Sequence, residues 1–320
     1  MTVMRFVFCL TALLASVAAS AKIVLRVGYF PNVTHAQGVI GSYSTAQGRG
    51  WFEQRLGPDV AVQWFAFNAG PSAMEAIFAG SIDLTYVGPS PALNAHIRSG
   101  GDEIRVLAGA AEGGAALVVR KVGGPQVPAE FRGKKVGTPQ PGNTQDVAAR
   151  TWLRQHGFRV STTGGDVQVI PTANADQLAL FTTGRLDAVW TVEPWVSRLE
   201  LEGGGRIYLE QRQAVTTLLV ARAKLLREHP AVAKKFLAAH QELTEWMVAH
   251  EGEARRQVRA GLTAATRREV SAELIDAAWA RLRFTSKIRR DQLEGLVADA
   301  QNVGFLRNAI PLDQLLWSPP

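Results

Sequence analysis

Apolar residues along this chain form short β-branched runs that alternate with longer segments of helical spacing. The first three runs cover 22–29, 60–67 and 82–87, and each ends at glycine, proline or asparagine. Between them, residues 34–51 and the stretch that ends at Gly80 place apolar and small side chains three and four positions apart. Strand, helix, strand, helix, strand is the order that produces a parallel sheet with crossover helices.

The same order of elements returns about a hundred residues later. Residues 134–139 parallel the opening strand, and 167–170 parallel the second strand. Residues 79–86 align without a gap on 183–190, since both copies have a glycine that ends a helix, then an aspartate, then an apolar strand. Repetition of a whole supersecondary unit predicts two similar α/β lobes.

Apolar segments also connect the two repeats. Residues 106–111 and 115–120 flank Glu112-Gly113-Gly114, and 215–221 form another β-branched run after the second repeat. Two strands that cross between lobes, one outward and one returning, would form a hinge. We therefore expect lobe 1 to comprise 22–111 and 215–320, and lobe 2 to comprise 112–214.

The C-terminal hundred residues have helical spacing. Val232, Phe236, Leu243 and Met247 mark one face of a helix expected at 231–250. Leu274, Ala277, Ala278 and Leu282 mark another helix. We expect this tail to pack against lobe 1.

The first twenty-one residues have the pattern of a secretory signal peptide. Arg5 precedes an uncharged apolar run at 6–19, and Ala19-Ser20-Ala21 supplies an A-x-A cleavage site. A membrane anchor is the competing interpretation, but the run is shorter than the roughly 20 residues that a bilayer requires. We expect cleavage after Ala21 and a periplasmic location for the mature protein.

Composition then excludes several classes of function. The chain has 320 residues, is 47% hydrophobic and carries a formal net charge of +7, which is spread along the sequence and gives no basic arm for nucleic acid. Its one cysteine, Cys9, lies within the signal peptide, so the mature chain has no disulfide or thiol nucleophile. We find no G-x-S-x-G, P-loop or H-E-x-x-H motif, and we expect no cofactor and no metal.

Small, hydroxyl and amide residues follow the predicted strands in both lobes. In open α/β sheets, ligands bind at the carboxyl ends of strands, where helix N-termini offer free N–H groups. Asn32 follows the first strand, Gly88 and Ser90 follow the third, and Asn143 and Thr144 open a helix in the second lobe. Each of these residues taken alone also suits an ordinary turn or helix cap. Two facing arrays of this kind predict a cleft for a small oxyanion.

Glu193 and Trp195 stand at the entrance of the last helix of the second repeat. A carboxylate is unfavourable at an anion site unless it meets a cation or a backbone donor, so Glu193 either binds a substrate ammonium group or caps its helix. Trp195 either forms part of the core or lines the pocket.

Four segments resemble the periplasmic substrate-binding proteins of ABC importers for aliphatic sulfonates, taurine and nitrate. They are Val27–Asn32, Tyr86–Pro91, Gly133–Pro139 and Glu193-Pro194-Trp195. The resemblance implies a two-lobed type II periplasmic-binding fold, in which each lobe is a mostly parallel sheet flanked by helices and two strands form the hinge. Carried over position by position, the implied ligand contacts are Phe30, Pro31, Asn32, Gly88, Ser90, Asn143, Thr144, Glu193 and Trp195.

The same resemblance implies binding without reaction. The expected protein is a monomer that captures a small anion, an aliphatic sulfonate or taurine, and delivers it to the permease and ATPase of an ABC transporter. Glu-Pro-Trp is closer to the nitrate branch, so nitrate or another small anion or heterocycle is the alternative ligand. Two other functions are alternatives on the same fold. A thiamin-precursor enzyme would need a base such as His35. A ligand sensor would present its closed form to a receptor instead of a permease.

Overall fold

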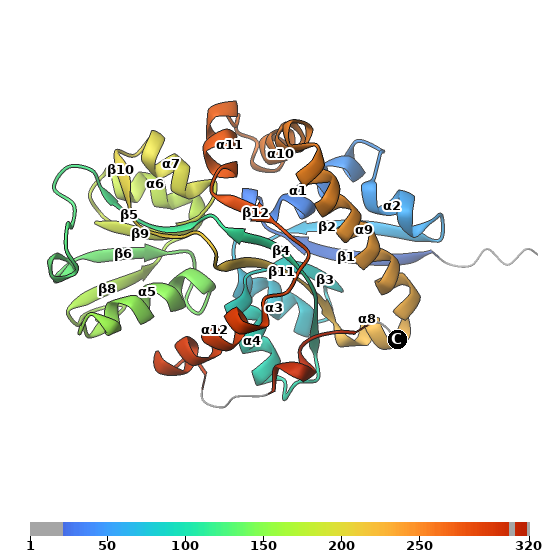
Figure 1. Ribbon diagram of the computed structural model, residues 1–320, viewed down its shortest axis with the longest axis horizontal. Coiled ribbons are helices and arrows are strands. Elements are labelled where there is room, and N and C mark those ends of the chain that lie inside the picture. The colour runs from blue at the N-terminus through green and yellow to red at the C-terminus, as the bar shows by residue number, and fades with distance from the viewer. Residues whose placement is uncertain (1–21, 307–310, 319–320) are drawn as a thin grey trace, which may run out of the picture.

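Two six-stranded sheets organise the chain (Figure 1). The computed structural model describes residues 22–306 and 311–318, so the expected signal peptide, 1–21, lies outside the described residues. Sheet A has the strand order β12-β4-β11-β3-β1-β2, and sheet B has the order β10-β5-β9-β6-β8-β7. Each sheet with its helices forms one lobe of an α/β protein, as the sequence pattern predicts.

Sheet A combines a parallel part with an antiparallel part. β1 pairs in parallel with β2 and β3, because crossover helices connect these three strands, whereas β11 and β12 pair antiparallel with their neighbours. The sheet is therefore mixed, and the mostly parallel arrangement expected from the sequence describes only its β2-β1-β3 side. Its strands are β1 (Ile23–Tyr29), β2 (Val60–Ala66), β3 (Leu84–Val87), β4 (Ile104–Gly113), β11 (Val215–Arg222) and β12 (Leu282–Phe284).

Sheet B repeats this plan. β6 lies between β8 and β9 and is parallel to both, and β5 is antiparallel to β9 and β10. β5 is apolar without interruption because its alternate side chains enter two different cores, one on each face of the sheet. Its strands are β5 (Ala115–Arg120), β6 (Lys135–Thr138), β7 (Val160–Ser161), β8 (Val167–Pro171), β9 (Ala188–Val192) and β10 (Gly205–Gln211).

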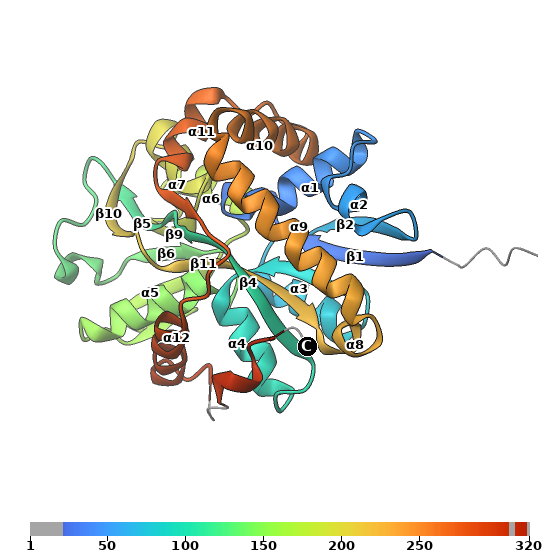
Figure 2. The same cartoon turned by 45° about the vertical axis from the view of Figure 1, so that its right-hand side comes forward.

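Helices cover both faces of each sheet. On sheet A, one core joins α1 (Ala36–Ala46), α2 (Trp51–Leu56), α9 (Pro230–Ala249), α10 (Glu251–Thr266) and α11 (Ala272–Trp279). The other face holds α3 (Gly70–Phe78), α4 (Pro89–Arg98) and α12 (Arg290–Asn302), and α8 (Ala223–Glu228) follows β11. On sheet B, α5 (Thr144–Gln155) packs on one face, and α6 (Asn174–Thr182) and α7 (Trp195–Leu201) pack on the other. Figure 2 shows α9 crossing over sheet A.

The chain passes between the sheets twice. β4 ends at Gly113, and β5 begins after Gly114; both glycines have positive φ, 76° and 67°, so the connection turns where other residues would be strained. The return runs from β10 through residues 212–214 into β11.

Two details of the helical prediction are wrong. The expected helix at 34–51 is a 3-10 turn at Val33–His35 followed by α1 and α2, because Gly48 with φ of 69° ends the first helix. Leu282 belongs to strand β12, which pairs with β4, and α11 ends at Trp279.

Two features are absent from the part of the chain that the structure describes. None of its helices has the length and apolar character needed to span a bilayer. No group of three or more histidine, cysteine, aspartate or glutamate side chains in those residues could hold a metal ion.

Candidate ligand-binding cleft

A polar cleft lies between the two sheets, where the carboxyl ends of their strands face one another. Sheet A and its connections contribute Phe30, Asn32, Thr34, His35, Asn68, Ala69, Gly70, Gly88, Pro91 and Thr216. Sheet B and its helices contribute Pro139, Asn143, Thr144, Gln145, Asn174 and Val192. The free volume is about 30 Å³, so the two sides are nearly in contact.

Four helices begin at this cleft. Gly70 is the first residue of α3, Gly88 is the N-cap of α4, Asn143 is the N-cap of α5, and Asn174 is the first residue of α6. The first N–H groups of a helix lack intrahelical partners, and its dipole is positive at that end. Four such ends at one cleft favour an anionic ligand.

Direct contacts hold the two sides of the cleft together. The backbone N–H of Ser90 donates to Oγ1 of Thr144 at 3.3 Å, and Nε1 of Trp195 donates to Oδ1 of Asn32 at 2.9 Å. Gly88 is also close to Thr144, since a Cβ at that position would lie 2.5 Å from the threonine oxygen. Each of these contacts joins the sheet A side to a sheet B helix, so the two lobes are in direct contact across the cleft.

His35 is the one titratable side chain among the described lining residues. Its ring lies 4.3 Å from that of Phe30, and its Nδ1 is 3.0 Å from Oγ1 of Thr34. Burial lowers the pKa of His35 to about 3, so the imidazole is neutral at physiological pH. Its Nε2 is buried without a hydrogen-bond partner in the described structure. No charged side chain therefore lines the described cleft.

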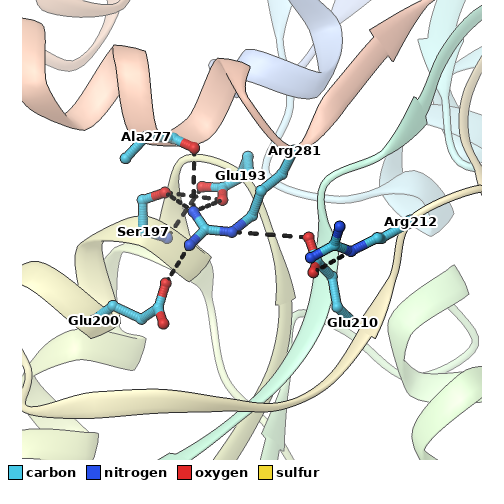
Figure 3. Close-up of polar contacts among 7 residues, drawn as sticks. All are labelled: Glu193, Ser197, Glu200, Glu210, Arg212, Ala277 and Arg281. Carbon is cyan, nitrogen blue, oxygen red and sulfur yellow. Dashed lines mark hydrogen bonds and ion pairs between the residues drawn. The ribbon is translucent and has the colours of Figure 1, made fainter.

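Glu193 is fully buried and is not among the residues that line the cleft; Figure 3 shows it with its polar partners. Its Oε2 accepts from the backbone N–H of Ser197 at 3.1 Å, and its Oε1 accepts from the Ser197 hydroxyl at 2.9 Å and from Nη1 of Arg281 at 3.1 Å. Burial raises its pKa to about 7, although Ser197 and Arg281 act in the opposite direction. Both carboxylate oxygens are thus engaged at the start of α7 and point to partners outside the cleft lining.

Arg281 brings this network together from the other lobe. It lies between α11 and β12, and its guanidinium also donates to Glu200 at 2.5 Å and to the carbonyl of Ala277 at 3.1 Å. Glu210 is within 3.9 Å. One arginine of the sheet A lobe thereby faces three carboxylates of the sheet B lobe (Figure 3).

The predicted site residues do not all lie together in the structure. Phe30, Asn32, Gly88, Asn143 and Thr144 line the cleft together. Ser90 and Trp195 join its two sides through the hydrogen bonds given above. Pro31 and Trp195 line an adjoining outer groove of about 310 Å³ that also contains Arg198 and Arg268, and Glu193 lies in neither lining.

The sequence-based prediction missed several residues of the cleft lining and one residue of the network around Glu193. Gln145 is the second residue of a predicted helix, and Asn68 follows a predicted strand. Both could have been predicted, because ligands bind at the carboxyl ends of strands and at helix N-termini. Thr216 lies in the returning strand β11, and Arg281 is 88 positions from its partner Glu193; nothing local in the sequence indicates either one.

Two lobes that close a neutral, donor-rich cleft at the ends of their strands define the class of periplasmic-type binding proteins. The chain belongs to the NMT1-like family, which matches residues 18–263.

Relatives and solved structures agree with this class. The chain is 30% identical over 195 residues to the "Putative aliphatic sulfonates-binding protein" of Escherichia coli (strain K12), which covers 60% of this chain and 56% of that protein. It is 26% identical over 181 residues to the taurine-binding periplasmic protein of the same organism, with coverage of 55% and 54%. These relatives are named as binding proteins and not as enzymes.

Solved structures share the two-lobe fold. The alkanesulfonate-binding protein SsuA from Xanthomonas axonopodis pv. citri bound to MOPS aligns with a TM-score of 0.74 and 18% identity, over 93% of this chain and 99% of that one. The periplasmic nitrate-binding protein NrtA from Synechocystis PCC 6803 aligns with a TM-score of 0.73 and 17% identity, over 94% and 93%. At these identities the likeness shows the fold alone.

Proposed function

We propose that this chain is an extracytoplasmic solute-binding protein that captures a small oxyanion of the aliphatic sulfonate or taurine class. The observation that carries the proposal is the convergence of four helix N-termini on one cleft with a neutral lining. Relatives named for sulfonates and taurine support the choice of anion.

Binding relies on neutral donors. The three oxygens of a sulfonate accept hydrogen bonds from N–H groups at the starts of α4 and α5 and from the Thr144 hydroxyl, and Asn32 and Asn143 contribute further polar contacts. Phe30 provides an apolar wall for the organic part of the ligand. Pro31 and Trp195 border the outer groove through which the ligand reaches this site.

Entry requires the lobes to separate, because the closed cleft has a free volume of only about 30 Å³. The two passages between the sheets, at 113–114 and 212–214, form the hinge of this motion, with lobe 1 comprising 22–111 and 215–320 and lobe 2 comprising 112–214. Closure adds the donors of α5 to those of α4, so the ligand selects the closed state through contacts that only this state provides.

The protein binds its ligand without a reaction. A general base works best when its pKa is near the operating pH, and the pKa of His35, about 3, is far below it. The mature chain starts after Ala21, acts as a periplasmic monomer, and passes its ligand to the permease and ATPase of an ABC importer. Solved structures named as ABC import components support this assignment.

A thermal-shift screen of the protein from Lys22 onward tests the assignment. Short alkanesulfonates, taurine and nitrate are added separately, with chloride at equal ionic strength as the control. A ligand at 100 times its Kd stabilises the folded state by about 2.7 kcal/mol, which raises the melting temperature by a few degrees. The absence of any shift with a sulfonate or taurine refutes the proposal, and a shift with nitrate alone would replace the sulfonate class by nitrate.

A further inference from the structure

The charge balance of the cleft points to a narrower ligand class. Among the described residues, the lining has amide, hydroxyl, glycine, proline and apolar groups and one neutral imidazole, with no carboxylate. A ligand that carries an ammonium group beside its anion would bury that cation without an acidic partner. Burial of an unpaired cation is far more costly than burial of a methyl group of similar size.

Glu193 is the carboxylate whose position in the sequence best suits an ammonium contact. It directly follows Val192, which lines the cleft, but successive side chains of an extended strand point to opposite sides. The two oxygens of Glu193 are held by Ser197 and Arg281, and Arg281 is itself fixed by Glu200 and by the carbonyl of Ala277 (Figure 3). The network therefore keeps this negative charge away from the ligand and compensates it internally.

We propose that the cleft is selective for oxyanions whose remaining atoms are uncharged, so that a short alkanesulfonate binds and taurine is rejected, because its lining has no carboxylate and Ser197 and Arg281 hold Glu193 outside that lining. This inference rests on the proposed function, because it concerns the same cleft and the same anionic group.

Asp299 is another carboxylate to consider as a partner for an ammonium group, because its groove shares residues with the cleft. It lines a separate groove of about 170 Å³ along α5, together with Trp152, Trp190 and Leu296. Thr144, Gln145 and Thr216 border both this groove and the cleft. Asp299 itself is not among the residues that line the cleft, so it is not offered to a ligand held there.

Isothermal titration with two matched probes tests the inference. Taurine and 1-propanesulfonate have the same chain length and differ by an ammonium group in place of a methyl group. The wild-type protein is expected to bind 1-propanesulfonate at least tenfold more tightly than taurine at about pH 7.5. Equal affinities, or tighter binding of taurine, would overturn the inference and leave the proposed function intact. Failure of both probes would refute the proposed function, and the inference with it.

Variants then identify the source of the selectivity. Glu193→Gln keeps the size of the side chain and removes its charge, and it is expected to leave the ratio of the two affinities within twofold; Glu200→Gln, which removes another carboxylate from Arg281, is the matched control. A selective loss of taurine binding in Glu193→Gln would show that Glu193 contacts the ammonium group and would contradict the proposal.

Asn174→Asp adds a carboxylate to the lining and keeps the oxygen that accepts from Gln177 at 3.1 Å. It is expected to shift the ratio toward taurine by at least fivefold, whereas Asn302→Asp, at an exposed position on α12, leaves the ratio unchanged. An unchanged ratio in Asn174→Asp would show that lining charge does not set the selectivity, and would overturn the inference.

Discussion

Replacing Gly88 with alanine tests how closely the two lobes must approach. Gly88 has φ of −65° and ψ of 152°, a conformation that alanine adopts without strain. The added Cβ would lie 2.5 Å from Oγ1 of Thr144, in the opposite lobe, and 3.7 Å from the carbonyl oxygen of Thr216. The clash with Thr144 exists only while the lobes are closed, so the substitution disfavours the closed state and not the folding of either lobe.

The size of the effect follows from the cost of overpacking. Inserting a methyl group into a well-packed contact costs about 1–3 kcal/mol. A factor of ten in affinity corresponds to about 1.4 kcal/mol, so the Kd for an alkanesulfonate is expected to rise by roughly 5- to 150-fold. The melting temperature without ligand is expected to change little, because the open protein has no such clash.

A double-mutant cycle tests whether contact between Gly88 and Thr144 limits closure of the lobes. Titration calorimetry is performed on the wild type, Gly88→Ala, Thr144→Ala and the double variant. Thr144→Ala weakens binding by itself, since it removes a hydroxyl that faces the cleft, but it also removes the atom with which the new methyl group collides. Adding Gly88→Ala to Thr144→Ala is therefore expected to cost little more. Additive losses, or unchanged affinity in Gly88→Ala alone, would show that the contact does not limit closure.

Three further predictions concern buried polar groups. Burial raises the pKa of Glu193 to about 7 from 4.5, so the folded protein keeps a proton that the unfolded chain releases. Stability should fall by about 3 kcal/mol as the pH rises from 4.5 to 7, and Glu193→Gln should flatten that dependence in thermal unfolding; parallel curves would contradict it. His240 bridges the Tyr86 hydroxyl and the Gly109 carbonyl at 3.0 and 2.8 Å, so His240→Ala should cost about 2–4 kcal/mol, whereas exposed His250→Ala should not. Trp195→Phe removes the 2.9 Å bond to Asn32 and should weaken ligand binding by roughly fivefold, measured by calorimetry; no change would show that this bond does not support closure.

The regular part of the fold could be predicted because its signals are local. The β-branched runs give the bounds of β1, β2, β6 and β8 to within two residues. The repeated pattern of glycine, aspartate and strand predicts that the two lobes have the same plan. α9, at Pro230–Ala249, lies one residue from the range expected from its apolar face.

The limits of the helix prediction also have a local cause. Residues 34–51 have helical spacing throughout, but α1 ends at Ala46, just before Gly48, whose φ of 69° is not helical. β12 has three residues, which is too short for a period to be recognised, and it exists because β4 offers an unpaired edge.

The part of the candidate site whose residues follow strands or open helices could be predicted from the sequence. Phe30, Asn32, Gly88, Asn143 and Thr144 follow strands or open helices, and the parallel order of the strands brings them together. The environment of Glu193 could not be predicted, because its partner Arg281 comes from the C-terminal tail and meets it only after both lobes have formed. Long-range ion pairs of this kind leave no periodic signal in a sequence.

The two passages between the sheets also affect the order in which the chain can assemble. All strands of sheet B come from one continuous segment, 115–211, whereas sheet A needs β1 to β4 from the beginning of the chain and β11 and β12 from its end. As the chain emerges in order, sheet B has every strand it needs before the centre of sheet A, where β11 inserts between β3 and β4, is available. The lobe that begins first is completed last, and until β11 arrives its two central strands expose edges that could pair with other chains.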